Sequence, residues 1–236
     1  MVKKQKHKIS ENSPISLISL TNKSSPVSEQ YRTIRTNIQF SSSADDPIKT
    51  LVITSSGPGE GKSTCAANIA LVFAQAGQRT LLVDADMRKP TVFRTFNLTN
   101  EKGLSTILST PKTLSEVVQQ TEIEHLSIVT SGPMPPNPSE ILSSNRMTQV
   151  IKEMRGQFDI VIFDTPPIVA VTDAQILSSS ADGTLLVVRE NVSKKEDLLK
   201  AKDLLDFVQA RVLGAIYNGA ENNKDQAYQY YYTTEK

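Results

Sequence analysis

The chain has 236 residues, of which 38% are hydrophobic, and this fits a single α/β domain with short extensions at its ends. Its formal net charge is +1, so bulk charge gives no argument for a nucleic-acid partner, and we expect none. The single cysteine, Cys65, excludes an intrachain disulfide and suits a reducing, cytoplasmic setting.

Residues 1–26 are rich in Lys, Ser, Asn and Pro, so we expect a flexible N-terminal arm over residues 1–27, with a short apolar patch at residues 15–20. Their basic start lacks the apolar segment of a signal peptide. The whole chain contains no apolar run of about 18 residues, the length that spans a membrane. Any association with a membrane is therefore expected to come through a partner.

A helix is predicted over residues 28–40, with Ser28 as its cap. Tyr31, Ile34 and Ile38 fall on one face of this helix at helical spacing. The helix could be a solvated element packed on its own domain, or a docking helix for a neighbouring subunit. The periodicity leaves both interpretations open.

The glycine-rich stretch at residues 50–64, TLVITSSGPGEGKST, predicts a buried strand, a tight turn and the start of a helix. Glycines in the turn let main-chain N–H groups face a phosphate, and the helix adds free N–H groups and the positive end of its dipole. Lys62 can reach the β- and γ-phosphates of ATP, and Ser63 can bind Mg²⁺. The pattern G-x-x-x-x-G-K-[ST] is broken at its first position, Ser56, but the flanking strand and helix still predict a P-loop.

Two later strands are predicted to end in carboxylates. Residues 80–83 precede Asp84 and Asp86, and residues 158–163 precede Asp164. Because ligands of parallel sheets lie at the carboxyl ends of the strands, these side chains are expected beside the phosphates. Asp84 and Asp86 could hold Mg²⁺ or take a proton from an attacking hydroxyl, and Asp164 is the expected further Mg²⁺ ligand. The open alternative is that each aspartate only forms a turn or a cap.

The remaining segments alternate between helix and strand. Asn137, Pro138 and Glu140 form a capping-box pattern at the start of a helix that runs to about residue 154. Further helices are predicted over residues 113–120, from 172, and over 193–210, and further strands over 126–129, 184–188 and 212–217. This alternation predicts a mostly parallel central sheet with helices on both faces, the α/β architecture of P-loop NTPases, over residues 28–218.

Asn218 follows the last strand on the ligand side, where it either contacts the nucleotide base or forms a plain turn. The residues expected to bind ATP are Gly57, Pro58, Gly59, Glu60, Gly61, Lys62, Ser63, Thr64 and Asn218. The expected metal ligands are Ser63, Asp84, Asp86 and Asp164, and the expected catalytic residues are Lys62, Asp84 and Asp86.

Residues 219–236 are expected to form a flexible tail. Four of the six tyrosines lie in it, namely Tyr228, Tyr230, Tyr231 and Tyr232. They could form a sticky tail or a strand that joins a partner's sheet. The alternative is that they accept phosphate. Each phosphate adds a charge of about −1.5 to −2 at pH 7, so four would make the tail strongly repelling.

Taken together, these segments resemble the bacterial tyrosine kinases of capsular and exopolysaccharide systems. The resemblance covers the chain from about residue 28 to its C-terminus and depends on SGPGEGKST, LLVDADMRKP, GPMPPNPSE, FDIVIFDTPP and the tail tyrosines. It implies a protein-tyrosine kinase that uses ATP and Mg²⁺ and autophosphorylates its tail in trans within an oligomer. The site residues that it implies are Lys62 and Ser63 for ATP and Mg²⁺, Asp84 and Asp86 for Mg²⁺ and tyrosine activation, and Asp164 for Mg²⁺.

The resemblance also implies partners. Glu29, Arg32 and Arg35 match the E-x-x-R-x-x-R pattern of the family's subunit contact, in a ring where one subunit's tail enters its neighbour's active site. The lack of a spanning segment resembles the split, Gram-positive form of the family. Its activator is a separate transmembrane protein, which would recruit this chain to the inner face of the cell membrane. Exogenous proteins phosphorylated on tyrosine and a cognate tyrosine phosphatase are the further partners implied.

Two other functions remain open. The fold is shared with ATPases that position the division machinery or partition plasmids, which resemble one another in a second lysine five residues before the main one. Gly57 occupies that position here, which argues against a sandwich dimer activated by that lysine but not against a regulatory ATPase. The other candidate is a non-catalytic, ATP-binding assembly factor. The tail tyrosines favour the kinase over both.

Overall fold

The computed structural model describes residues 15–43 and 47–220 of the chain. The predicted phosphate acceptors lie outside these residues, as does the start of the predicted arm; the acceptors are Tyr228, Tyr230, Tyr231 and Tyr232. Within the described ranges, no helix combines the length and the apolar character needed to cross a bilayer.

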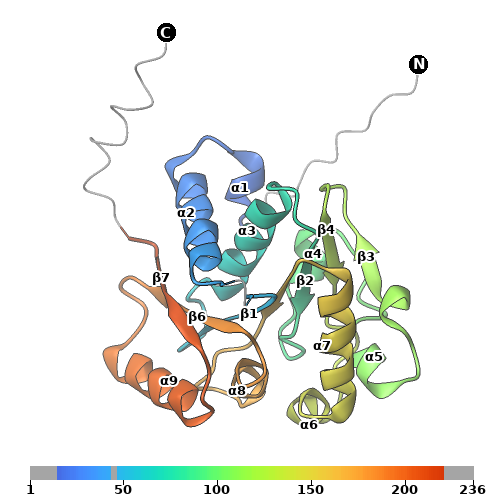
Figure 1. The fold of residues 1–236 in the computed structure, drawn as a ribbon. Coiled ribbons are helices and arrows are strands. Elements are labelled where there is room, and N and C mark those ends of the chain that lie inside the picture. The colour runs from blue at the N-terminus through green and yellow to red at the C-terminus, as the bar shows by residue number, and fades with distance from the viewer. Residues whose placement is uncertain (1–14, 44–46, 221–236) are drawn as a thin grey trace, which may run out of the picture.

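A seven-stranded sheet runs through the described residues (Figure 1). Its strands lie in the order β3-β4-β2-β5-β1-β6-β7, and each neighbouring pair is parallel except β3 with β4. The strands are β1 (Thr50–Ser55), β2 (Thr80–Asp84), β3 (Val118–Gln120), β4 (Leu126–Val129), β5 (Ile160–Asp164), β6 (Gly183–Arg189) and β7 (Val212–Asn218). The inner strands β1, β2 and β5 are buried along their whole length because helices cover both faces. The predicted α/β class with a mostly parallel sheet is confirmed.

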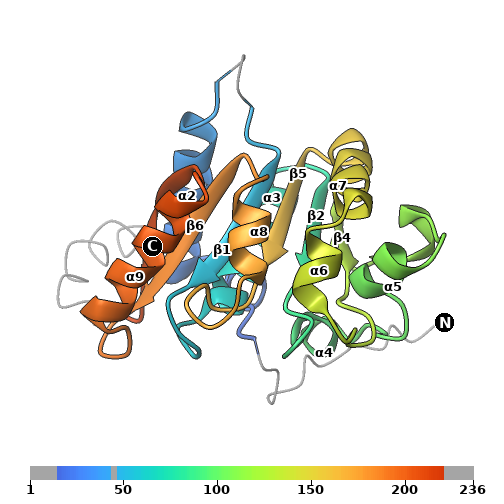
Figure 2. The ribbon, with the colours of Figure 1, turned by 90° about the horizontal axis from the view of Figure 1, so that it is seen from below.

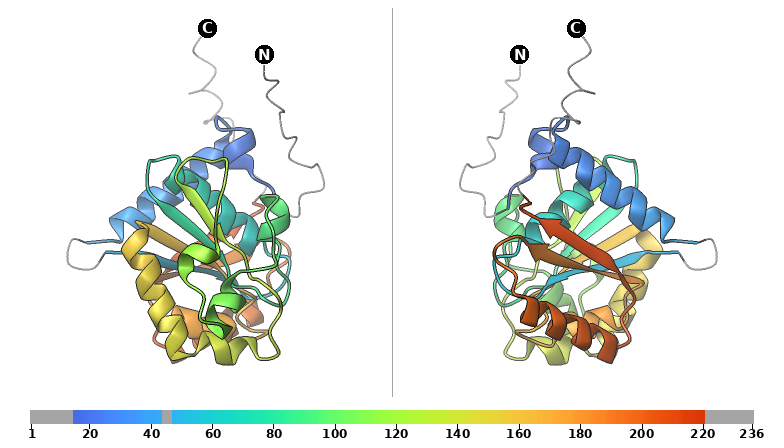
Figure 3. Two further views of the ribbon diagram at one scale, coloured as in Figure 1. Left: turned by 90° about the vertical axis from the view of Figure 1, so that its right-hand side faces the viewer. Right: turned by 90° about the vertical axis from the view of Figure 1, so that its left-hand side faces the viewer.

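Helices cover both faces of this sheet (Figures 2 and 3). They are α1 (Ile18–Thr21), α2 (Pro26–Phe40), α3 (Lys62–Ala74), α4 (Val92–Thr95), α5 (Leu104–Ser109), α6 (Pro138–Leu142), α7 (Asn145–Gln157), α8 (Asp173–Ser178) and α9 (Lys195–Phe207). Successive strand residues point to opposite faces. Leu51 and Ile53 of β1 therefore pack in the layer of α2 and α3, whereas Val52 packs in the layer of α5, α6 and α7.

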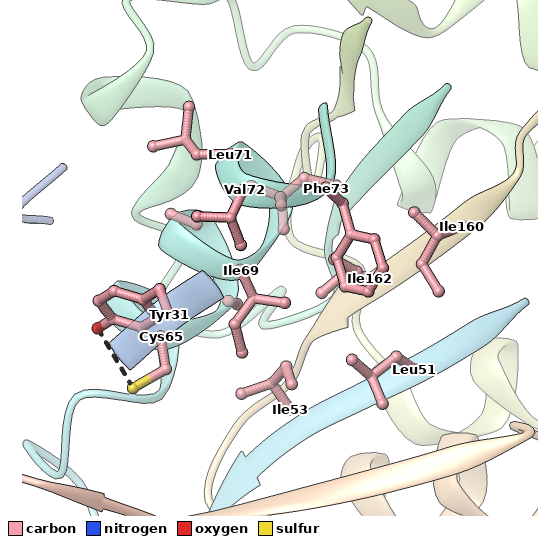
Figure 4. Packing of buried hydrophobic residues seen from close by; sticks show 14 of the residues in the cluster. Tyr31, Leu51, Ile53, Cys65, Ile69, Leu71, Val72, Phe73, Ile160 and Ile162 are labelled. Atoms are coloured by element: carbon pink, nitrogen blue, oxygen red, sulfur yellow. Dashed lines mark hydrogen bonds between the residues drawn. The ribbon is translucent and has the colours of Figure 1, made fainter. Parts of the chain in front are cut away.

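Residues 65–74 of helix α3 are buried on every side, since α2 covers one side of the helix and the sheet covers the other. Figure 4 shows Ile69 above Ile53 of β1 and Phe73 above Ile162 of β5. On the far side, the Tyr31 hydroxyl of α2 donates to the Cys65 thiol at 3.8 Å. Burial raises the pKa of Cys65 to about 11, so this cysteine is a core residue rather than a reactive thiol.

The segment before α2 differs from the sequence-based prediction of a flexible arm. Ile15 and Leu17 are buried in the α3 layer, and the Ser19 amide donates to Asn68 of α3 at 2.9 Å. Residues 15–27 therefore belong to the packed domain. The polar composition predicted flexibility, and this is wrong for residues 15–27 because polar groups of this segment bond to α3 instead of water.

Helix α2 also begins earlier than predicted. Pro26 occupies its first turn, where a missing N–H costs nothing, and the Ser25 hydroxyl accepts from the Ser28 amide at 3.0 Å. Ser25, rather than Ser28, is therefore the cap.

The predicted helix over residues 113–120 is wrong. A capping box between Thr113 and Glu116 closes a single 3₁₀ turn, η1 (Leu114–Glu116), and the chain then extends into β3. Strand β3 pairs antiparallel with β4 at the edge of the sheet.

The predicted helix from residue 138 to 154 is in fact two helices, α6 and α7. Ser144 starts the second one because its hydroxyl accepts from the Met147 amide at 3.2 Å. At the start of α6, Asn137 precedes the helix as predicted. Its side-chain Nδ2 donates to the Glu140 carboxylate, however, and no capping box forms.

Candidate active site

The P-loop connects β1 to α3. Gly59 and Gly61 have φ angles of 77° and 94°, in the left-handed region that glycine adopts without strain. Gly57 does not share this conformation, so two of the three predicted glycines serve the turn in this way. A Cβ added to Gly61 would also lie 2.2 Å from Nδ2 of Asn218. Position 61 therefore requires glycine for its main-chain conformation, and a side chain there would also displace Asn218.

The departure from the P-loop pattern at Ser56 has a structural explanation. The Ser56 amide and hydroxyl donate to the two carboxylate oxygens of Glu60, at 2.9 and 2.7 Å, and both residues are buried. Serine therefore closes the loop by holding Glu60, a contact that glycine cannot make with a side chain. The Glu60 carboxylate is occupied inside the loop, so a phosphate would meet the main chain of Glu60 and not its side chain.

Two residues from the neighbouring strands hold the P-loop from outside. Asn218 at the end of β7 donates from Nδ2 to the Glu60 carbonyl at 3.0 Å, and Arg189 at the end of β6 donates to the Gly59 carbonyl at 2.8 Å. Asn218 therefore lies beside the loop as expected, and its contact with a nucleotide base stays a prediction. Arg189 was not among the residues predicted from the sequence, although it lies at the carboxyl end of a strand, as Asn218 does.

Lys62 brings the predicted charged residues together. Its Nζ lies 3.0 Å from Oδ2 of Asp86, 4.0 Å from Oδ1 of Asp164 and 3.3 Å from the Ser63 hydroxyl. Burial alone would lower the pKa of Lys62, but the charges of Asp164, Asp86 and Asp84 outweigh it and raise that pKa. Lys62 is thus held as a cation at the start of α3. Of the other predicted contacts, Pro58 lies in the loop and Thr64 in the first turn of α3.

Asp84 and Asp164 are fully buried and incompletely paired. One Asp84 oxygen accepts from the amides of Thr91 and Val92, at 3.2 and 3.1 Å. The other Asp84 oxygen and both Asp164 oxygens have no hydrogen-bond partner within the described residues. Burial, reinforced by the charge of Asp164, raises the pKa of Asp84 well above its ordinary value, and burial also raises the pKa of Asp164.

These unpaired oxygens fit a Mg²⁺ site. Mg²⁺ takes hard oxygen ligands, and in nucleotide sites it takes one or two carboxylates while phosphates and water supply the rest. The described residues contain no cluster of three or more His, Cys, Asp or Glu side chains arranged to hold an ion without such help. Asp84 and Asp164 could therefore supply part of a Mg²⁺ ligand set beside Ser63, with the phosphates of a nucleotide completing it.

The three residues of the predicted subunit contact lie on α2. Arg32 pairs with Glu29 on the same helix, and Arg35 donates to the Val72 carbonyl of α3 at 2.8 Å. Arg32 and Arg35 also line a cavity of about 660 Å³ beside Gly77. Gly77 precedes β2, so this cavity lies at the end of the sheet opposite the P-loop. Contact with another subunit stays a prediction.

Comparison with known proteins identifies the family. A family model described as "AAA domain" matches residues 48–210, which include the P-loop and the three aspartates. The tyrosine-protein kinase YwqD of Bacillus subtilis is 50% identical over 92% of this chain and 91% of its own length. The putative tyrosine-protein kinase CapB of Staphylococcus aureus is 42% identical over 88% of this chain and 91% of its own length.

Solved structures agree with this assignment. The chimerical protein CapA2B2 has a TM-score of 0.81 and 43% identity, over 85% of this chain and 88% of that one. The septum site-determining protein MinD of Pyrococcus horikoshii has a TM-score of 0.63 at 22% identity, over 75% of this chain and 72% of that one, which shows a shared fold alone. Because the kinase relatives match nearly their whole length and the loop, strand ends and sheet order are those of a P-loop enzyme, the chain belongs to the bacterial tyrosine-protein kinase family.

Proposed function

We propose that this chain is an ATP-dependent protein-tyrosine kinase that phosphorylates tyrosines, including those of its own tail. The observation that supports this best is the set of buried carboxylate oxygens that lie beside Lys62 and Ser63 without a hydrogen-bond partner among the described residues. Buried carboxylate oxygens without hydrogen-bond partners destabilise the fold, and binding of a nucleotide and a cation at this site would offset that cost. The tail tyrosines supply the acceptors.

ATP would bind over the P-loop. Main-chain N–H groups of Gly57, Gly59, Glu60 and Gly61 and of the start of α3 would hold the phosphates, with Lys62 on the β- and γ-phosphates. In the structure the Lys62 amine is bound to Asp86, with 3.0 Å between Nζ and Oδ2. Phosphates would compete for this amine. ATP binding would therefore release Asp86 from its ion pair.

The residues that would hold Mg²⁺ are Ser63, Asp84, Asp86 and Asp164. The ion would supply positive charge that offsets the charge on the β- and γ-phosphates.

The reaction would be an in-line displacement. The phenol oxygen of tyrosine attacks the γ-phosphorus, the bond from that phosphorus to the bridging oxygen breaks, and ADP leaves with the electron pair. A free tyrosine has a pKa of about 10, so its hydroxyl needs help at neutral pH. Asp84, with Asp86 nearby, would orient the phenol and accept its proton.

The acceptors in this proposal are Tyr228, Tyr230, Tyr231 and Tyr232 of a neighbouring copy, within a ring joined through Glu29, Arg32 and Arg35. Glu29 and Arg32 are partly exposed on α2, which leaves both side chains accessible to a neighbouring copy. A separate transmembrane activator would bring the ring to the inner face of the membrane. There it would regulate capsule or exopolysaccharide synthesis, phosphorylate other proteins on tyrosine and be reversed by a tyrosine phosphatase.

The test is mass spectrometry of the tail after incubation with Mg-ATP. Cleavage after Lys224 yields residues 225–236 as one peptide with all four tyrosines. We expect phosphate on this peptide in the wild type and none in Lys62→Met. Equal phosphorylation of the wild type and of Lys62→Met would show that Lys62 is not part of the catalytic site. Hydrolysis of ATP without labelling, even with candidate activator tails added, would instead support the regulatory ATPase.

A further inference from the structure

An arginine and a buried aspartate form a second charged pair beside the predicted catalytic residues. Arg88 lies in the segment between β2 and α4, and Asp173 is the first residue of α8. Arg88 Nε and Nη2 donate to the two oxygens of Asp173, at 3.1 and 3.2 Å. The Asp173 side chain is 0% exposed, whereas that of Arg88 is 34% exposed. The pair therefore has a buried anchor and an accessible cation.

This geometry fixes the direction of the guanidinium. A carboxylate that holds an arginine through two parallel hydrogen bonds restricts both its position and its plane. The remaining nitrogen, Nη1 of Arg88, donates to no group among the described residues. Arg88 thus presents a fixed, unused pair of N–H donors.

The chain places this cation next to the nucleotide site. Arg88 follows Asp86 by two residues, and Asp86 is tied both to Lys62 and, through the Lys89 amide at 3.0 Å, to its own loop. The hydrogen bonds to Asp173 raise the pKa of Arg88, and the charge of Asp86 contributes. Arg88 therefore lies in the same loop as the carboxylate that binds Lys62.

We propose that Arg88, held in place by Asp173, contacts the phosphoryl group while it passes from ATP to its acceptor. This rests on the proposed kinase function. The bond changes are those given above, and Arg88 gains and loses no proton. It offsets charge on the phosphoryl oxygens during transfer, as a second fixed cation beside Lys62. Asp173 is a positioning residue, because it acts through Arg88.

Two binding measurements test the proposal without depending on the acceptor. ADP with aluminium fluoride mimics the phosphoryl group in transfer, whereas ADP alone lacks it. We expect Arg88→Ala and the double variant Arg88→Ala/Asp173→Asn to bind ADP as the wild type does and to lose the extra affinity for ADP–aluminium fluoride. The double variant is included because Arg88→Ala alone leaves a buried charge without a partner.

Transfer kinetics on the full chain give the second readout. In Arg88→Ala we expect kcat for tail labelling to fall by about 100-fold or more, with KM for ATP unchanged, on the scale of arginine contacts in phosphoryl transfer. Asp173→Asn should cost about 10- to 100-fold by loosening Arg88. In the Arg88→Ala background, Asp173→Asn should add no further loss.

Arg155 and Asp182 provide a matched control pair. They lie 2.7 Å apart, Arg155 is also 34% exposed, and Asp182 binds the amides of Lys49 and Thr50 at the start of β1, away from the P-loop. Asp182→Asn should lower the melting temperature and leave the ratio of the two affinities unchanged. The proposal is overturned if Arg88→Ala keeps the wild-type ratio, or if the losses from Arg88→Ala and Asp173→Asn multiply. If Arg88→Ala lowers the ratio of the affinities for ADP–aluminium fluoride and ADP, but even the wild type phosphorylates no tyrosine, then the role of Arg88 is supported and the proposal that tyrosine is the acceptor is wrong.

Discussion

Asp84 and Asp164 hold carboxylates in a place that water does not reach. Three of their four oxygens have no hydrogen-bond partner in the described part of the chain, and Lys62 is shared with Asp86. A buried charge without full compensation destabilises a fold. These two residues therefore weaken the nucleotide-free protein at the same atoms that would serve its chemistry.

Asp84→Asn should separate these two effects. The amide oxygen can still accept from Thr91 and Val92, while the charge and its repulsion by Asp164 disappear. We expect the nucleotide-free variant to be more stable by about 1 kcal/mol, seen as a rise in Tm of about 2–4 °C, and to transfer no phosphate. A lower Tm in the variant would contradict the account of Asp84 as an uncompensated charge.

The same residue predicts a dependence of stability on pH. The pKa of Asp84 is higher in the folded protein than in the unfolded chain, where it is about 3.9. The folded state therefore binds the Asp84 proton more tightly than the unfolded chain does. This proton binding stabilises the folded protein at low pH, and the stabilisation is lost as pH rises through the pKa of the folded state. The Tm difference between Asp84→Asn and the wild type, measured without nucleotide or Mg²⁺, should grow as pH rises above about 4.

At the scale of elements, the segment that leads into α2 determines where the domain begins. Its apolar residues enter the α3 layer, and polar side chains of α3 and of Gln75, directly after it, bond to its main chain. Asn68 accepts from the Ser19 amide, and Gln75 donates to the Ser19 carbonyl at 2.9 Å. The segment is thus a structural part of the layer that covers the P-loop helix.

Leu17→Ala decides between a packed segment and a flexible arm. Leu17 is 5% exposed, so truncation should leave a cavity and reduce the free energy of unfolding by about 2–5 kcal/mol. A flexible arm would show no change. Val27→Ala is the control, since Val27 is 47% exposed on the adjoining helix and its loss should matter little. Urea unfolding of the full chain measures both.

At the scale of the whole molecule, the last strand ends at the carboxyl edge of the sheet, beside the P-loop. Asn218, at the end of β7, binds the Glu60 carbonyl of the P-loop, and the described chain ends at residue 220. The unmodified chain carries a net charge of +1. Four phosphotyrosines would add about −6 to −8, enough for the tails of neighbouring copies to repel one another.

Replacement of all four tail tyrosines by phenylalanine should therefore favour the oligomer. We expect a larger species on size-exclusion chromatography after incubation with Mg-ATP, compared with wild type treated in the same way. Added salt should reduce the difference, because it screens the repulsion. If the phenylalanine variant stays monomeric where unphosphorylated wild type assembles, charge repulsion does not control assembly.

Local patterns in the sequence were enough to predict the class of fold and the position of the P-loop, whereas the roles of the individual site residues stay predictions. The apolar runs before Asp84 and Asp164 are buried strands, and the run from Ser56 to Ser63 is a P-loop, because strand burial and glycine conformation are recorded in adjacent residues. Errors occurred where composition substituted for packing, as in residues 15–27, or where a second cap interrupted a helix, as at Ser144.

Contacts between distant residues could not be predicted from such patterns. Asn218 and Glu60 are 158 residues apart, and Arg88 and Asp173 are 85 apart. No periodicity or spacing links the members of either pair, since strand order brings them together and strand order follows from how the whole sheet packs. The sequence by itself therefore determined the P-loop. Only the tertiary structure shows that Asn218 contacts this loop and that Asp173 holds Arg88, because both contacts join residues far apart in the chain.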